Sequence, residues 1–190
     1  MIFNGEMVRA ILDGGKTQTR RPVKAPHIDR DAMCELSGNE LAGELSAGNY
    51  RNSPHGKPGD RIWVRETWAR YNIDQDSHYM AYRATPPADW PEEGRWRPSI
   101  HMPRWASRIT LEITGVRVER LQAITLGDIC KEIGCGLYDF RPATYGFQVW
   151  ENLWKSIYGE DGWQSNPWVW VIEFKVVPNV PANSTGPDLR

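Results

Sequence analysis

The sequence has little of the chemistry by which disulfide-rich, redox and metal-binding proteins are recognised. It contains three cysteines and four histidines among 190 residues. The cysteines are odd in number and form no C-x-x-C pair, and the histidines show no H-x-x-x-H or H-x-E spacing. These residues are Cys34, Cys130, Cys135, His27, His55, His78 and His101. We therefore expect reduced, unpaired thiols, no metal site and no cofactor.

Long apolar runs and an excess of one charge are also lacking. No stretch reaches the roughly eighteen apolar residues that a membrane-spanning helix needs. The first six residues have neither the basic n-region nor the apolar h-region of a signal peptide. The formal net charge of −1 argues against binding nucleic acid by bulk charge, but a local basic pocket remains compatible with it. We expect a cytoplasmic protein without membrane contact, of a length that suits one hydrophobic core.

Tryptophan, by contrast, is abundant, with ten residues. Those in segments with helical or strand periodicity are expected to be largely buried, namely Trp63, Trp150, Trp154 and Trp170. Trp90, Trp96 and Trp105 lie in a Pro- and Arg-rich stretch instead, and Trp90 and Trp96 are expected to be less buried. Aromatic side chains in such a stretch either fix a long loop to the domain or stack on nucleic-acid bases.

The periodicity predicts an α+β domain. Alternation of period two predicts strands at 61–66, 79–83, 107–121 and 168–176, with a bulge at Gly115. Helical spacing predicts a short helix after Asn4, a second over 126–133 capped by Thr125, and a long amphipathic helix over 145–157. The mixture predicts a single domain over 1–177 whose strands close into a barrel.

Two polar segments interrupt this pattern. Residues 24–58 and 85–103 are rich in Gly, Pro and polar side chains, which is typical of long insertions or mobile loops. We expect both to lie outside the barrel core and to flank the mouth of a pocket. The tail at 178–190 contains Pro, Asn, Ser and Gly and is expected to be disordered.

Three short motifs occur along the chain in an order that is typical of one family. The segment Gly15-Lys16-Thr17-Gln18-Thr19-Arg20-Arg21 follows the first predicted helix, Gly59-Asp60 precedes a strand, and Val169-Trp170-Val171-Ile172-Glu173-Phe174 closes the domain. Together they resemble the G-x-K-T-x-T-x-R element, the G-D turn and the last strand of ASCH domains. The resemblance spans residues 5–176, and its Trp-rich form looks most like the phage- and prophage-borne branch. It implies a PUA-like mixed β-barrel with flanking helices and two loop insertions, which handles RNA or a modified nucleoside.

The resemblance also implies site residues. Bacterial N4-acetylcytidine amidohydrolases of this family use a Lys, a Thr and a Glu, which implies Lys16 as proton acceptor, Thr19 as nucleophile and Glu132 as proton donor. Asp128 on the same predicted helix is the rival acid. We further expect substrate-binding roles for Arg20, Arg21, Glu66, Trp68 and Arg104. Glu66 is expected either to pair with an arginine or to line the pocket.

The chemistry that these residues would perform is physically reasonable. A threonine hydroxyl needs a base to become a nucleophile, and a desolvated lysine beside other cations can be that base. Arg20 and Arg21 would lower the pKa of Lys16, and a carboxylic acid can protonate a leaving amine. Residues 16 and 19 face opposite sides of a regular strand, so their convergence requires the chain to bend after Gly15.

The sequence leaves three functions open. The first is a pocket for a modified nucleoside, with amide hydrolysis at N4 of cytidine as its most specific form. The second is a non-catalytic RNA-binding module, in which basic residues hold phosphates and an aromatic side chain stacks on a base. The third is a single-stranded RNA ribonuclease, in which Lys16 and the arginines stabilise charge on phosphate. The oligomeric state is left open as well.

Overall fold

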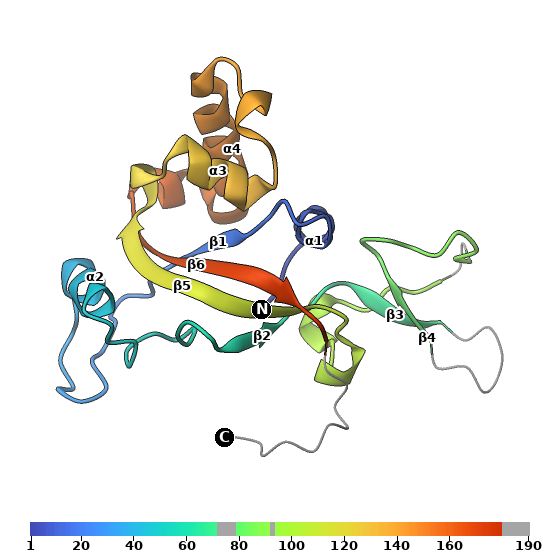
Figure 1. Cartoon of the computed structure of the whole chain (residues 1–190), viewed down its shortest axis with the longest axis horizontal. Helices are drawn as coiled ribbons and strands as arrows, with labels where there is room; N and C mark the ends of the chain where they lie inside the picture. Colours follow the sequence, from blue (N-terminus) through green and yellow to red (C-terminus); the bar gives the residue numbers. More distant parts are fainter. Residues whose placement is uncertain (72–78, 92–93, 180–190) are drawn as a thin grey trace.

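The computed structural model describes residues 1–71, 79–91 and 94–179, which form an α+β fold (Figure 1). A four-stranded antiparallel sheet with strand order β1-β6-β5-β2 curls into a half-barrel. Its strands are β1 (Gln18–Pro22), β6 (Trp168–Val177), β5 (Thr110–Arg120) and β2 (Arg61–Trp63). The predicted α+β class is confirmed. No strand in the described part of the chain joins β1 to β2, so the sheet stays open where we expected a closed barrel.

Strands β5 and β6 form the centre of the sheet, and their alternation assigns each side chain to a face. Val169 and Val171 pack with the helices at Leu126–Ile133 and Ala143–Gln164, whereas Trp170 and Ile172 pack on the opposite face of the sheet. The register shifts between Ile113 and Gly115, which confirms the predicted bulge. Both faces of the sheet are therefore covered, each by its own hydrophobic cluster.

Three helices were predicted, and all three are present. Helix α1 (Gly5–Leu12) is capped by Asn4, and α3 (Leu126–Ile133) is capped by Thr125. Helix α4 (Ala143–Gln164) changes direction at Gly159, whose φ is 78°. Trp150 and Trp154 of its predicted apolar face are buried, whereas Phe147 and Ile157 of the same face are 43% and 48% exposed. Short 3-10 helices complete the fold at Ser99–His101, Arg104–Ala106, Leu121–Ala123 and Leu137–Asp139.

The expectation for residues 24–58 was wrong in part, because they contain a helix. Helix α2 (Gly38–Ser46) begins with a full capping box, in which Ser37 and Glu40 bond each other's backbone amides. Leu41 and Leu45 are buried in the cluster of Trp170 and Ile172, so this segment contributes to the core. The sequence did not predict this helix, because the segment is polar and only two of its leucines face the core.

The strand assignment between 61 and 83 also needs correction. The chain leaves β2 after Trp63 and forms a separate two-stranded ribbon, β3 (Trp68–Tyr71) with β4 (Tyr79–Tyr82). This ribbon extends beyond one end of the main sheet (Figure 1). Residues 24–58 and 85–103 supply no strand to the four-stranded sheet within the described ranges, as expected, although Arg97 bridges to Trp68 on the ribbon.

The tryptophans follow most of the predicted division. Trp150, Trp154 and Trp170 are buried, and Trp90 and Trp96 are half-buried and stacked, with ring centroids 4.1 Å apart. Trp63 is only half-buried, contrary to expectation. It lies on the edge strand β2, where the Arg65 guanidinium covers its ring at 4.4 Å.

The C-terminal segment and membrane contact were also predicted. Pro178 and Asn179 are described, and the Asn179 side chain bonds to Thr110 and to the Ser107 carbonyl. The rest of the tail for which we predicted disorder, residues 180–190, lies outside the described residues. No helix in the described ranges is long and apolar enough to span a membrane.

Candidate ligand site

Lys16 occupies a buried position between β1 and α3. Its side chain is 1% exposed, and its Nζ donates to the Gln18 carbonyl at 2.7 Å, to the Glu132 carbonyl at 2.5 Å and to Glu132 Oε2 at 3.3 Å. An ammonium group has three N–H donors, and all three have acceptors here. Lys16 therefore ties the start of β1 to the C-terminal turn of α3.

Two glycines make this approach of backbones possible. The Lys16 amide bonds to the Ala10 carbonyl, and the Thr17 amide bonds to the Lys131 carbonyl. A Cβ atom on Gly15 would lie 2.7 Å from the Gly134 carbonyl oxygen, so a side chain there would separate the two segments. The residue with a positive φ, of 76°, is Gly14, one position before the bend that we expected. Gly15 instead allows the close contact with Gly134, because it has no side chain.

Arg20 extends the charged cluster beneath α3. Its side chain is fully buried, and its Nη1 donates to Glu132 Oε1 at 3.0 Å. Its Nη2 contacts Glu119 and lies 3.4 Å from Asp128 Oδ2. Arg117, at the rim of the cluster, bonds to Glu119 and Asp128 as well. Because Lys16 and Arg20 both contact Glu132, this carboxylate and not Asp128 is the acid next to Lys16.

The surroundings of Lys16 act on its pKa in opposite directions. Burial lowers the pKa of Lys16 most, the Glu132 carboxylate raises it, and Arg21 and Arg20 lower it further. The net result is a pKa below the ordinary value, as the arginine-rich sequence predicted. For Asp128, burial acts to raise the pKa, but Arg20 and Arg117 outweigh it and hold the pKa low. The environment thus favours an ionised Asp128 and lowers the affinity of Lys16 for its proton.

Thr19 lies on the opposite face of β1 from Arg20. It pairs with Ile172 in the register of the sheet, whereas Arg20 pairs with Val171. No hydrogen bond links the Thr19 hydroxyl to Lys16 or to any other group in the described part of the chain, so the structure does not join the two expected catalytic residues directly. Since β1 is an edge strand, Thr19 still reaches a cavity beside it.

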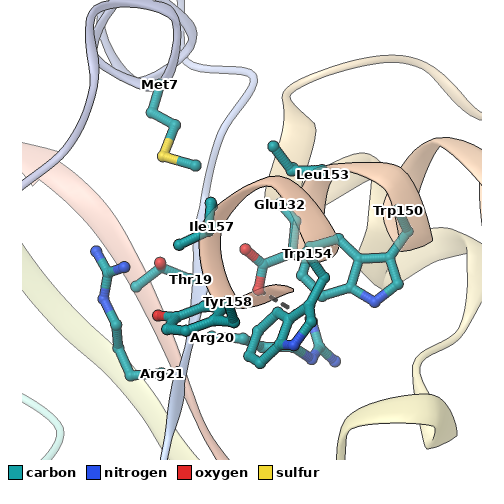
Figure 2. A pocket seen from close by; sticks show the side chains of 10 residues that line it. All are labelled: Met7, Thr19, Arg20, Arg21, Glu132, Trp150, Leu153, Trp154, Ile157 and Tyr158. Atoms are coloured by element: carbon teal, nitrogen blue, oxygen red, sulfur yellow. Dashed lines mark hydrogen bonds and ion pairs between the residues drawn. The ribbon is translucent and has the colours of Figure 1, made fainter. Parts of the chain in front are cut away.

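That cavity is small and lies between β1 and α4. It measures about 20 Å³, enough for one water molecule, and Figure 2 shows the Glu132 carboxylate turned toward it. Its polar lining comes from Thr19, Arg20, Arg21 and Glu132, and its apolar lining from Met7 and from α4. Lys16 is not part of the lining. Glu132 is therefore the group that contacts Lys16 and also shares a cavity with Thr19.

A much larger cavity adjoins this one. It measures about 730 Å³ and shares Arg21 and Tyr158 with the small cavity. Its other lining residues are Met1, Pro22, Lys24, His27, Pro54, His55, Ile62 and Trp170. The size is within the range of roughly 300–1,000 Å³ that is usual for small-molecule sites.

The lining of the large cavity combines aromatic rings with positive charge. The rings of His27 and His55 pack on Trp170, with centroids 5.6 and 5.8 Å from it. Burial, followed by the charge of Arg21, lowers the pKa of His55 to about 4, so its imidazole is neutral near pH 7. Arg21 and Lys24 then provide the cationic side chains of the wall. Such a wall suits a planar ligand that carries negative charge.

The remaining predicted substrate residues lie elsewhere. Glu66 is 3% exposed and accepts two hydrogen bonds from Arg108, at 2.8 and 3.0 Å, which confirms the expected arginine partner. Trp68 is buried with Met102 and Ala106, and Arg104 is exposed on a 3-10 helix. None of the three lines either cavity. The predicted substrate-binding residues therefore lie in two places. Arg20 and Arg21 lie on the edge strand β1, whereas Glu66, Trp68 and Arg104 lie near the β3–β4 ribbon.

Several residues of the site were missed in the sequence. Glu119 follows Arg117 by two positions on a strand, and this spacing places both on one face, a signal that could have been read. His27, His55 and Tyr158 carried no such signal, because they come from a loop, a turn and a helix end that meet only in the fold.

Comparison with known proteins adds no relative. The chain matches no family model, no curated protein and no solved structure. Among the described residues, no group of three or more His, Cys, Asp or Glu side chains is placed to hold a metal ion.

Proposed function

We propose that this protein binds a nucleoside or nucleotide in the large cavity beside β1. The observation that carries the proposal is the cavity itself: about 730 Å³, lined by Trp170, two imidazoles and the cations Arg21 and Lys24. A planar base fits against aromatic rings, and a phosphate or electron-rich exocyclic oxygen fits the cationic wall. Neutral His55 can bond a base edge without adding charge.

The family proposal agrees with this location. We infer that the chain is an ASCH-type, PUA-like protein, because the K-T-x-T element, the G-D turn and the last strand occur in the family's order. The K-T-x-T element leads into β1, which pairs with the last strand β6; Thr19 lines the small cavity, and Trp170 of β6 lines the large one. The resemblance and the cavity thus support the same region independently.

Amide hydrolysis at N4 of an acetylated cytidine is the second candidate. Thr19 and Glu132 line one small cavity next to the large one, and Lys16 contacts Glu132. In this reaction the Thr19 hydroxyl transfers its proton to neutral Lys16 and attacks the acetyl carbon. The proton taken up by Lys16 passes to Glu132 through their contact and from Glu132 to N4 as the C–N4 bond breaks, and water then releases acetate and restores the Thr19 hydroxyl. The lowered pKa of Lys16 favours the neutral amine, but its three acceptors favour the ammonium, so hydrolysis requires Lys16 to leave one of these bonds.

A binding experiment tests the first proposal. Calorimetric titration with cytidine, N4-acetylcytidine and cytidine monophosphate should give saturable binding to at least one of them. Arg21→Gln should weaken the phosphate-bearing ligand roughly ten- to a hundredfold, the usual loss of a charged hydrogen bond. Arg51→Gln, which changes an arginine outside both cavities, is the matched control. Absence of saturable binding for all three ligands would show that the cavity does not have this role.

Hydrolysis is tested separately by chromatography of N4-acetylcytidine after incubation with the protein. Turnover that disappears in Thr19→Val, an isosteric change without the hydroxyl, would support the nucleophile. Binding without turnover in the wild type would leave a nucleoside-binding protein and remove the hydrolase candidate.

A further inference from the structure

A second surface with nucleic-acid chemistry lies on the β3–β4 ribbon, away from both cavities. We call it the Trp105 surface, and it consists of Arg70, Arg97, Arg104 and Trp105. Trp105 is 57% exposed, and the three arginines are exposed as well. None of the four residues lines the cavities beside β1.

The exposed Trp105 ring has a rigid support. It meets the ring of Trp68 edge-on, with centroids 5.8 Å apart and planes at 87°. Trp68 is itself 2% exposed and packs with Met102 and Ala106. Because Trp68 is fixed in this cluster, Trp105 is held in one orientation although most of its ring is in water.

The arginines surround this aromatic pair at short range. The Arg70 guanidinium carbon lies 5.6 Å from the Trp105 centroid, and that of Arg97 lies 5.3 Å from the Trp68 centroid. Arg97 is fixed further by backbone hydrogen bonds with Trp68 in both directions. Arg104 directly precedes Trp105 on the same 3-10 helix. One guanidinium therefore lies beside the exposed indole, a second lies over the ring that supports it, and the third belongs to the residue next to Trp105 in sequence.

No ion-pair partner for these charges lies in the part of the chain that the structure describes. In the described ranges, no carboxylate forms an ion pair with Arg70, Arg97 or Arg104, whereas Arg20, Arg108 and Arg117 each have at least one such partner. An exposed ring and three guanidinium groups without an ion pair among the described residues contribute little to the fold. Their combination fits a ligand with a flat apolar face and regularly spaced negative charges.

We propose that the Trp105 surface binds single-stranded RNA, with an unpaired base stacked on Trp105 and the flanking phosphates paired with Arg70, Arg97 and Arg104. Single strands are favoured because a base must leave its stack to lie flat on an exposed indole. The choice of RNA over DNA rests on the proposed function of the cavity, whereas the stacking and charge arguments stand without it. With both sites, the protein would hold an RNA strand on the Trp105 surface and bind a single nucleoside or nucleotide in the large cavity.

Fluorescence anisotropy with a labelled oligouridine of about 12 nucleotides tests this proposal. Trp105→Ala should raise the Kd roughly 5- to 150-fold, the range for loss of one stacked base, and Trp105→Phe should retain part of the affinity. Each of Arg70→Gln, Arg97→Gln and Arg104→Gln should also reduce the slope of log K against log salt by about 0.7, because each removes one phosphate contact. Tyr138→Ala is the control for an exposed aromatic elsewhere, at 79% exposure, and should change neither quantity.

Two further results decide the proposal. Base-paired RNA of the same length should bind more weakly, and the Trp105 variants should bind cytidine as the wild type does, which separates this surface from the cavity. Unchanged RNA affinity in both Trp105→Ala and Arg70→Gln, with the far-ultraviolet spectrum intact, would overturn the proposal. Tighter binding of the matched single-stranded DNA than of the RNA would overturn the assignment to RNA.

Discussion

The buried carboxylate of Glu132 gives the sharpest prediction about stability. It is 4% exposed and has two cationic partners, Lys16 and Arg20. Glu132→Gln keeps the shape of the side chain and removes its charge. Arg20 retains Glu119 and Asp128 as partners, but Lys16 keeps only two carbonyl oxygens and the new amide. The variant therefore leaves a buried ammonium without a counter-ion.

The expected loss of stability is large and depends on pH. Removing one partner of a buried pair costs about 3–5 kcal/mol, because the other charge stays desolvated. Glu132 raises the pKa of Lys16, so its removal lowers a pKa that burial already depresses. Between that folded-state pKa and the higher unfolded value, the unfolded chain binds one more proton, so stability rises with pH by at most about 1.4 kcal/mol per pH unit. The deficit of the variant should therefore be smaller at about pH 9 than at about pH 7.

Urea unfolding followed by tryptophan fluorescence at the two pH values measures this difference. Lys16→Met added to Glu132→Gln removes the stranded charge and should restore part of the stability, which a double-mutant cycle quantifies. Asp31→Asn, which breaks the exposed pair with Arg51, should cost no more than about 1 kcal/mol. A loss below about 1 kcal/mol for Glu132→Gln, or a deficit that grows with pH, would refute the assignment of Lys16 as a buried cation paired with Glu132.

Two predictions concern the packing of the helices. Trp154→Ala should destabilise the fold by roughly 3–5 kcal/mol, because the ring is 2% exposed between α4 and the sheet; calorimetric unfolding that shows less than about 1 kcal/mol would contradict this burial. Leu41→Ala should cost about 2–5 kcal/mol, because α2 closes the cluster of Trp170 and Ile172; a near-neutral result in urea would mean that 24–58 is the peripheral loop that its composition suggested.

Local sequence signals predicted the structure correctly where it depends on interactions within one helix or strand. The side chains of Asn4 and Thr125 fixed two helix starts, and Gly115 fixed the bulge, since each acts on backbone within a few residues. The alternation along β5 and β6 was readable for the same reason. Helix α2 was missed because its two core leucines are too few to produce a recognisable stripe.

Pairing between strands depends on contacts far apart in the sequence. One strand was predicted over 61–66, yet β2 ends at Trp63 and pairs with β5, and the chain then enters β3, which pairs with β4 in a second sheet. A period-two pattern records which side chains are apolar and not which strand lies alongside. The closed barrel failed as a prediction for the same reason.

The candidate site shows the same division. The sequence by itself indicated that the chemistry of Lys16, Thr19, Arg20, Arg21 and Glu132 belongs together, and it places the first four within one short segment. Only the tertiary structure placed Lys16 in contact with Glu132 across 116 positions, put Thr19 on the other face of β1, and separated Glu66, Trp68 and Arg104 from both cavities. The physical reason is that side-chain chemistry is local to a residue, whereas distance and burial are set by the packing of the whole chain.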